Sequence, residues 1–482
     1  MPEWQVFCFF KEKVSWVSDF ADKRSSRNIQ KLRSIISDRS FFIVYLFIIH
    51  YYLLHLMKSR LLLSAFLLGT VTLSAQAFNS ENPRHEKVMA QNLEQHTDTH
   101  SICLFHTPDA KGIPYRIPAI LSTPKGRLIA MSDYRYCGAD IGFGQIDIVG
   151  KYSDDQGKTW SEQFDIVKGN GIKNDPACGY GDAATLADSK SGDILLMCCT
   201  GNVTYWNSTR ENPLRAARLY SKDEGKTWSA PEDITEDIYS LFDQREQGPI
   251  KKLFIGSGKI CQSKQIKKGK YKRIYAALCT DGGNYVIYSD NFGKEWKVLG
   301  DVNQSPAPKG DEPKCEELPN GDVLLSSRKG YGRFYNIYSY KNKKKATGSW
   351  GEVVASHDCP GGIKTGANAT NGEVGIFKAI RNSDGKEVDL IIQSLPAAEN
   401  RAEVTIYYKA LESEADYATP KALASNWEGS YLVTHAGSGY STFCIQKDKK
   451  IGFFYEEEPG YYNMIYKTLS VEDITSGKYS MK

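Results

Sequence analysis

Hydrophobic and polar positions alternate in short blocks from about residue 100 onward, and this pattern predicts strands. Apolar runs follow polar turns in "STPKGRLIAM", "SKSGDILLM", "KKGKYKRIYAAL", "LPNGDVLLS" and "NSDGKEVDLII". A sixth copy, "QKDKKIGFFYE", lacks the Gly in its turn. The turns are 52 to 77 residues apart. Each unit therefore holds about four short strands, with no long amphipathic helix between them.

A second repeat lies within the same region. The stretches "YSDDQGKTW", "YSKDEGKTW" and "YSDNFGKEW" recur every 68 residues, counted from Ser153, Ser221 and Ser289. The Ser and Asp side chains can bond turn amides, Gly accepts a positive φ, and Trp can cover a hairpin. Asn291 replaces the Asp of the other copies, and Asn cannot perform acid chemistry. The repeat therefore predicts a scaffold element rather than an active site.

These repeats predict an all-β fold for residues 99–482: a six-bladed β-propeller with four antiparallel strands per blade. The aromatic content of 12%, with 29 Tyr, agrees with strands. The alternative is a pair of β-sandwiches, which would not need a regular period.

The N-terminal residues have a different character. "MKSRLLLSAFLLGTVTLSAQA", residues 57–77, has the basic start, apolar run and small-residue end of a signal peptide. We interpret residues 1–56 as an over-called extension and 78–98 as a linker. The alternative is a membrane anchor formed by residues 41–77. On the first interpretation the protein is exported, and it is periplasmic or extracellular after cleavage near Ala77.

Charge argues against a nucleic-acid-binding body. Residues 1–77 carry a net charge of +5, and the remaining chain carries −1. The Lys-rich stretches 264–273 and 341–345 indicate solvated hairpins, with a surface for anionic glycans as the alternative. The eleven Cys lack a paired C-x-x-C spacing, so neither a zinc site nor a dense disulfide framework is indicated. Cys198 and Cys199, in an apolar run, are expected to be buried thiols.

"YRIPAI" at residues 115–120, followed by the three repeats, resembles the bacterial exo-α-sialidases (neuraminidases) of the Asp-box, six-bladed β-propeller family. The resemblance extends from about residue 99 to the end. It implies a retaining glycoside hydrolase that removes terminal sialic acids from glycoproteins, glycolipids and oligosaccharides through a tyrosyl-enzyme intermediate. It implies no metal and no cofactor. The charge distribution argues against a nucleic-acid partner, and the signal peptide against stable membrane insertion of the mature chain.

Three arginines match the arginine triad of that family: Arg116 in "YRIP", Arg328 in "GDVLLSSR" and Arg401 in "ENRAEV". Three guanidinium groups around one point repel one another unless an anion joins them. Their planar donors suit a carboxylate such as that of sialic acid.

The resemblance also implies three catalytic residues. Asp140 in "CGADIGFG" matches the general acid/base, with Asp147 as its substitute. Tyr440 in "AGSGYSTF" matches the nucleophile, and Glu312 in "KGDEPK" matches its partner. The anomeric carbon of a sialoside bears a carboxylate that repels an anionic nucleophile, whereas a neutral phenol avoids this repulsion. Competitors of Glu312 are its neighbours in the next strand, Glu316 and Glu317.

Arg135 in "SDYRYC" and Asp175 in "NDPAC" match residues that hold the hydroxyl side of the sugar. Tyr205 and Trp206 are candidates for the N-acetyl pocket, or else for a hydrophobic core. His435 is expected to be structural. Two other functions stay open: a sialoglycan-binding propeller without catalysis, and a trans-sialidase that transfers sialic acid to another sugar.

Overall fold

The computed structural model describes residues 101–482, apart from 309–310, 368–369 and 459–460. The expected extension, signal peptide and linker lie outside the described residues. Within the described part, no helix is both long enough and apolar enough to cross a membrane.

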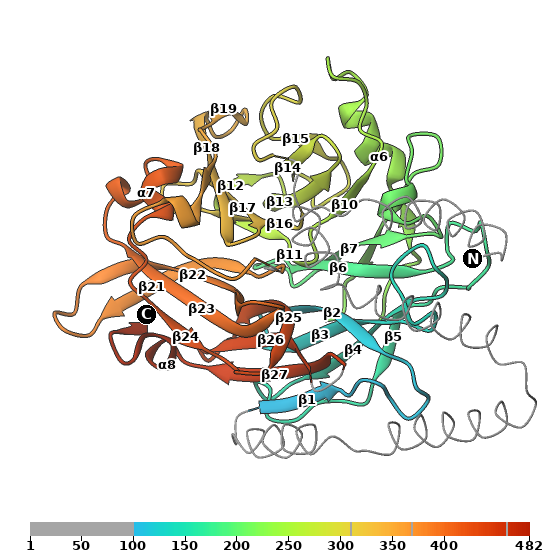
Figure 1. Cartoon of the computed structure of the whole chain (residues 1–482), viewed down its shortest axis with the longest axis horizontal. Coiled ribbons are helices and arrows are strands. Elements are labelled where there is room, and N and C mark those ends of the chain that lie inside the picture. Colours follow the sequence, from blue (N-terminus) through green and yellow to red (C-terminus); the bar gives the residue numbers. More distant parts are fainter. Residues whose placement is uncertain (1–100, 309–310, 368–369, 459–460) are drawn as a thin grey trace, which may run out of the picture. The chain divides into compact units, whose positions relative to one another are not determined.

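Strands dominate the described chain and form five sheets (Figure 1), which confirms the all-β prediction. The first sheet contains, in order, β2 (Tyr115–Ser122), β3 (Leu128–Tyr134), β4 (Asp147–Ser153) and β5 (Phe164–Val167). The second contains β11 (Gly258–Lys259), β6 (Tyr180–Ala187), β7 (Ile194–Thr200), β8 (Arg215–Ser221) and β9 (Glu232–Asp233). The third contains β10 (Leu253–Ile255), β13 (Tyr271–Thr280), β14 (Gly283–Ser289) and β15 (Lys297–Val298), and β12 (Cys261–Lys268) also pairs with β13.

The fourth sheet contains β16 (Pro313–Glu317), β17 (Val323–Lys329), β18 (Gly332–Asn342) and β19 (Thr347–Trp350), with β20 (Val354–Ala355) paired to β18. The fifth has nine strands: β1 (Ser101–Phe105), β27 (Asn463–Leu469), β26 (Ile451–Glu458), β25 (Gly437–Ile445), β23 (Ala402–Leu411), β22 (Glu387–Ala398), β21 (Val374–Arg381) and β28 (Tyr479–Met481), with β24 (Gly429–Leu432) on β23. The sheet sizes of four, five, five, five and nine differ from six sheets of four. The count of six blades therefore stays a prediction.

Helices are short in the described chain and lie between strands. They are α6 (Thr235–Tyr239), α7 (Pro420–Ala424), α8 (Val471–Thr475) and the 3-10 turns η1 (Tyr205–Asn207), η2 (Ser240–Phe242), η3 (Ser356–Asp358) and η4 (Glu414–Asp416). Several contacts between sheets involve β2 and β16: β2 contacts β6 and β25, and β16 contacts β12 and β21. In addition, the early strand β1 pairs with the late strand β27. Together these contacts give a β-propeller-like arrangement.

The repeated boxes are scaffold elements, as expected. In the first box the Ser153 hydroxyl bonds the Asp155 carboxylate at 2.8 Å and accepts from the amide of Gly157 at 2.8 Å. Gly157 has φ 84° and no room for a Cβ against Tyr466. In the third box Ser289 makes the same bond to Asn291 at 2.9 Å. The amide therefore replaces the carboxylate because the turn needs an acceptor and not an acid.

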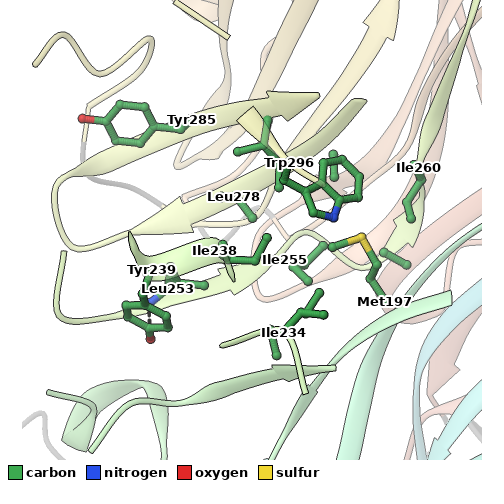
Figure 2. Packing of buried hydrophobic residues seen from close by; sticks show 14 of the residues in the cluster. Met197, Ile234, Ile238, Tyr239, Leu253, Ile255, Ile260, Leu278, Tyr285 and Trp296 are labelled. Carbon is green, nitrogen blue, oxygen red and sulfur yellow. Dashed lines mark hydrogen bonds between the residues drawn. The ribbon is translucent and has the colours of Figure 1, made fainter. Parts of the chain in front are cut away.

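The core lies between neighbouring sheets. Figure 2 shows one such cluster, in which Met197 of β7, Leu278 of β13 and Ile238 of α6 pack together with Trp296 of the third box. Trp296 is only 5% exposed, so the box fastens its turn to the core. Cys198 and Cys199 are buried, and burial raises the pKa of both thiols, which makes them inert.

Candidate active site

The candidate site lies at the starts of three strands, where the strand pairing is irregular. The pairing register shifts after Arg116 in β2, after Gly181 in β6 and after Ser438 in β25. Ile117 and Asp182 have positive φ values of 59° and 58° at two of these shifts. A bulge re-aims the side chains beside it, and strained residues of this kind gather at functional sites.

Arg116 is held by a buried carboxylate that the sequence did not indicate. Its Nε and Nη2 donate to the two oxygens of Glu456 at 2.7 and 3.2 Å. Glu456 also accepts from the amide of Ile117 at 2.8 Å and from that of Tyr440 at 2.9 Å. One carboxylate on β26 thus fixes Arg116 and the backbone of Tyr440 together. The Arg116 guanidinium lies 4.5 Å from the ring of Tyr462 and 5.8 Å from that of Tyr440.

Tyr440 and Glu312 are in direct contact. The Tyr440 hydroxyl donates to Oε1 of Glu312, and Arg328 Nη1 donates to Oε2 at 2.7 Å. Burial acts to raise the pKa of Glu312, but Arg328 and the hydrogen bonds hold it below its ordinary value. Burial and the charge of Glu312 raise the pKa of Tyr440 well above its ordinary value. At neutral pH the pair is therefore a phenol donating to a carboxylate.

A second charged group contains Arg135, Asp133, Asp140 and Asp182. Arg135 Nη2 lies 2.9 Å from Asp133 and 3.1 Å from Asp140. Asp133 is fully buried, whereas the side chain of Asp140 is 66% exposed. The other oxygen of Asp133 accepts from the amide of Asp182 at 3.0 Å. The buried Asp133 therefore fixes Arg135, and Arg135 in turn orients Asp140.

The two groups belong to one site, because Arg116 of β2 pairs in register with Asp133 of β3. Burial, followed by the charges of Asp140 and Asp133, raises the pKa of Asp182 well above the ordinary value, and Glu312 contributes to that rise. Asp182 in turn contributes to the raised pKa of Tyr440. Asp182 was missed from the sequence. Its only signal was an acidic residue opening the apolar run "GDAATL".

Arg401 reaches the site through its backbone. It lies in the turn between β22 and β23 with φ 58°, and its carbonyl accepts from the amide of Ser438 at 2.7 Å. Within the described part of the chain its side chain has no ion pair, in contrast to Arg116 and Arg328. The structure thus brings Arg116 to the ring of Tyr440, Arg328 to the partner of Tyr440, Glu312, and Arg401 near the site by its hairpin.

Asp175 lies in the loop before β6. Its Oδ1 accepts from the amide of Ala177 at 2.7 Å, and no hydrogen bond or ion pair among the described residues joins Asp175 to the other candidates. Asp147 accepts from the amide of Gly169 at 2.9 Å, which is a structural bond. The side chain of His435 is 66% exposed, 3.6 Å from Glu403.

The remaining candidates make their contacts outside the Tyr440 site. Glu316 pairs with Lys259 at 2.6 Å, and Glu317 accepts from the Ser263 hydroxyl. Tyr205 is half-buried against Phe254, and Trp206 is 78% exposed.

A cavity of about 240 Å³ lies at the opposite ends of the inner strands, where its lining includes Leu121, Ala187 and Cys444. It is therefore not part of the Tyr440 site. The described residues contain no group of three or more His, Cys, Asp or Glu arranged to hold a metal ion.

Comparisons with known proteins identify a repeat-domain family, several sialidases and a solved trans-sialidase. The BNR repeat-like domain matches residues 126–429. The sialidase of Clostridium perfringens is 27% identical over 297 residues, which cover 57% of this chain and 72% of that protein. The sialidase of Micromonospora viridifaciens is 27% identical over 365 residues, and the chain spans about half (51%) of its length. The solved intramolecular trans-sialidase of Ruminococcus gnavus, a complex with oseltamivir carboxylate, superposes with a TM-score of 0.57 at 18% identity and covers 75% of this chain and 95% of that one.

Proposed function

The chain belongs to the BNR repeat-like domain family, and from that premise we propose that it is an exo-α-sialidase. It would hydrolyse terminal sialic acids with retention, through a covalent bond between Tyr440 and the sugar. The observation that carries the proposal is the hydrogen bond from the Tyr440 hydroxyl to Glu312, with Arg328 on the other oxygen of that carboxylate. A phenol beside a fixed carboxylate is an activated nucleophile.

The arginines suit the carboxylate of the substrate because each has unused donors. Arg116 gives Nε and one Nη2 hydrogen to Glu456, which leaves Nη1 available. Arg328 uses Nη1 for Glu312 and Asp311, which leaves Nη2 available. Arg401 has no ion pair in the described chain. A carboxylate between these groups would accept charge-assisted, bidentate hydrogen bonds.

In the proposed reaction Asp140 protonates the leaving glycosidic oxygen while Tyr440 attacks the anomeric carbon and gives its proton to Glu312. Asp140 then takes a proton from a water that attacks the anomeric carbon; the bond to Tyr440 breaks, and Glu312 returns its proton to the Tyr440 oxygen. Arg135 holds Asp140 in position at 3.1 Å. Burial and the charges of Asp140 and Asp133 raise the pKa of Asp182, and this carboxyl is available for a contact with the sugar. We assign Asp182 rather than Asp175 to that contact.

We also propose that the nine-stranded sheet is two blades joined edge to edge. One would contain β21 to β24 with β28 at its edge, and the other β25 to β27 closed by β1. With the four other sheets this division gives six blades. Site residues then come from several blades, as is usual where loops converge on a propeller axis.

Transfer of sialic acid to another sugar is the second candidate. One neighbour in fold is named a trans-sialidase, but an intramolecular one, so its name supports transfer and not a separate acceptor. The test is to incubate the purified protein with a sialoside, with and without added lactose, beside the Tyr440→Phe variant. Free sialic acid from the wild type alone supports hydrolysis. Formation of sialylated lactose would show transfer instead of hydrolysis. Binding of the sialoside without any cleavage would support a glycan-binding propeller without catalysis.

A further inference from the structure

Two lysine-rich hairpins, distant in sequence, lie against each other in the structure. One joins β12 to β13 and the other joins β18 to β19. Arg273 Nη1 donates to the carbonyl of Lys343 at 2.8 Å, and Lys343 Nζ donates to Gln265 at 2.9 Å. The hydroxyls of Tyr275 and Tyr340 are also bonded, at 2.9 Å. The two hairpins therefore present one continuous surface.

Nine lysines gather there, and we call this surface the lysine face. Its members are Lys264, Lys267, Lys268, Lys270, Lys272, Lys341, Lys343, Lys344 and Lys345. Seven of them are exposed, and only Lys272 and Lys343 are half-buried. Residues 78–482 as a whole carry a net charge of −1. The positive charge is thus a local concentration and not a property of the whole chain.

Few acidic groups neutralise the lysine face. Lys270 lies 3.2 Å from Asp193, and Lys268 lies 3.3 Å from Asp290, whose carboxylate also binds Arg273. Lys264 is 3.9 Å from Glu316. The other six lysines have no ion pair within 4.0 Å among the described residues. Such a one-sided cluster produces a positive potential that attracts anions.

The lysine face lies far from the candidate active site. Arg328, near the end of β17, pairs across the hairpin with Arg333 at the start of β18. β18 then runs away from the site to Asn342. Nine residues of extended strand cover roughly 30 Å. A ligand on the lysine face would therefore leave the active site free.

The chemistry of the lysine face narrows the kind of partner. Among its described residues, the lysine face has no large exposed hydrophobic residue. The large hydrophobic residues exposed in the described chain, such as Phe143, Trp206 and Tyr461, all lie outside these two hairpins. Base stacking on single strands and insertion into a bilayer both need such groups. Arg273, the one arginine there, is buried and paired. Separate, flexible ammonium groups spread over two hairpins suit a hydrated chain of repeated anions better than one small anion.

We propose that the lysine face binds a polyanionic polysaccharide, one that carries repeated sulfate or carboxylate groups. Several weak ion pairs act together on such a chain, although each is worth little alone. Binding would hold the protein on an anionic glycan matrix and raise the effective concentration of any substrate attached to it. This role does not depend on the activity proposed for Tyr440.

The test measures binding of the purified protein to dextran sulfate, polygalacturonate and neutral dextran as a function of salt. The variant carries Lys267→Gln, Lys341→Gln, Lys344→Gln and Lys345→Gln. We expect the wild type to bind one or both polyanions, not neutral dextran, with affinity that falls as salt screens the charges. The variant should bind about tenfold or more weakly. Which polymer binds identifies sulfate or carboxylate as the recognised group.

A matched control removes the same charge elsewhere. The control variant carries Lys158→Gln, Lys222→Gln, Lys226→Gln and Lys449→Gln, at exposed positions outside the lysine face, and it should keep its affinity within about twofold. Equal unfolding temperatures exclude misfolding as the cause of any difference. Equal loss in the two variants, or no binding to either polyanion at low salt, would overturn the proposal. So would tighter binding to single-stranded DNA or anionic vesicles at matched charge.

Discussion

Replacing Glu456 by Gln removes the charge that holds Arg116 while keeping the shape of the side chain. Glu456 Oε1 accepts from Arg116 Nε and the amide of Ile117, and Oε2 accepts from Arg116 Nη2 and the amide of Tyr440. In either orientation of the Gln, its NH2 group faces two donors. Two hydrogen bonds are therefore lost, and one of them is to a charged partner.

The cost follows from this geometry. The side chain of Glu456 is fully buried and that of Arg116 is 22% exposed. Breaking a buried ion pair by changing one partner costs about 3–5 kcal/mol. Because water reaches part of Arg116, we expect the lower end, about 3 kcal/mol of unfolding free energy. The guanidinium and the Tyr440 backbone also lose their shared anchor, and a displacement of about 1 Å in a reacting group can lower kcat/KM about 100-fold.

Urea unfolding and sialoside hydrolysis measure the two effects on the same preparation. The control is Glu162→Gln, at an exposed position without an ion pair in the described chain, which should change the unfolding free energy by less than about 0.5 kcal/mol. If Glu456→Gln lowered stability by less than about 1 kcal/mol and left KM unchanged, the reasoning about Arg116 would be wrong.

Three further predictions concern the reacting groups. Tyr440→Phe should lose turnover by about 1,000-fold or more while substrate affinity, measured by calorimetry, is kept; normal turnover would remove Tyr440 as nucleophile. The pKa of Glu312 is lower in the folded protein than in the unfolded chain, where it is about 4.3. Its ionised form therefore stabilises the fold at pH values above the unfolded-state pKa, and this stability is lost as the pH falls through the folded-state pKa. Unfolding curves of Glu312→Gln should lack that acid-side loss, and an unchanged slope would contradict the assignment. Asp182 has a raised pKa, so its ionisation destabilises the fold above the unfolded Asp value. Asp182→Asn should then raise the unfolding temperature at pH 7 but not at pH 3, and it should raise KM. Asp175→Asn should leave KM within about twofold. A rise in KM with Asp175→Asn alone would assign the sugar contact to Asp175 instead of Asp182.

The repeated elements could be predicted from the sequence because their chemistry is local. The turn that starts at Ser153 needs only a hydroxyl, a carboxylate or amide, and a Gly within a few residues, and the structure contains those bonds. The joining of the C-terminal strands into one nine-stranded sheet could not be predicted. It depends on an edge contact, the pairing of Ala402 with Gly437, that no local pattern encodes.

The candidate site was predictable only in part for a similar reason. The residues Arg116, Glu312 and Tyr440 are far apart in sequence, and it was the family resemblance that grouped them. Glu456 gave no signal, because its position within "FFYEEE" looks like an ordinary strand end. Asp182 was overlooked in favour of Asp175, since only the register shift in β6 turns Asp182 toward the other acids.

The central claim, a retaining reaction through Tyr440, is tested most directly by the anomer that is released first. Time-resolved proton NMR of an α-linked sialoside mixed with the purified protein distinguishes the two anomers before they equilibrate. Our account predicts that α-sialic acid appears first and changes to the β-anomer later. Early release of the β-anomer would contradict it, because a single displacement by water leaves no covalent bond for Tyr440 to make.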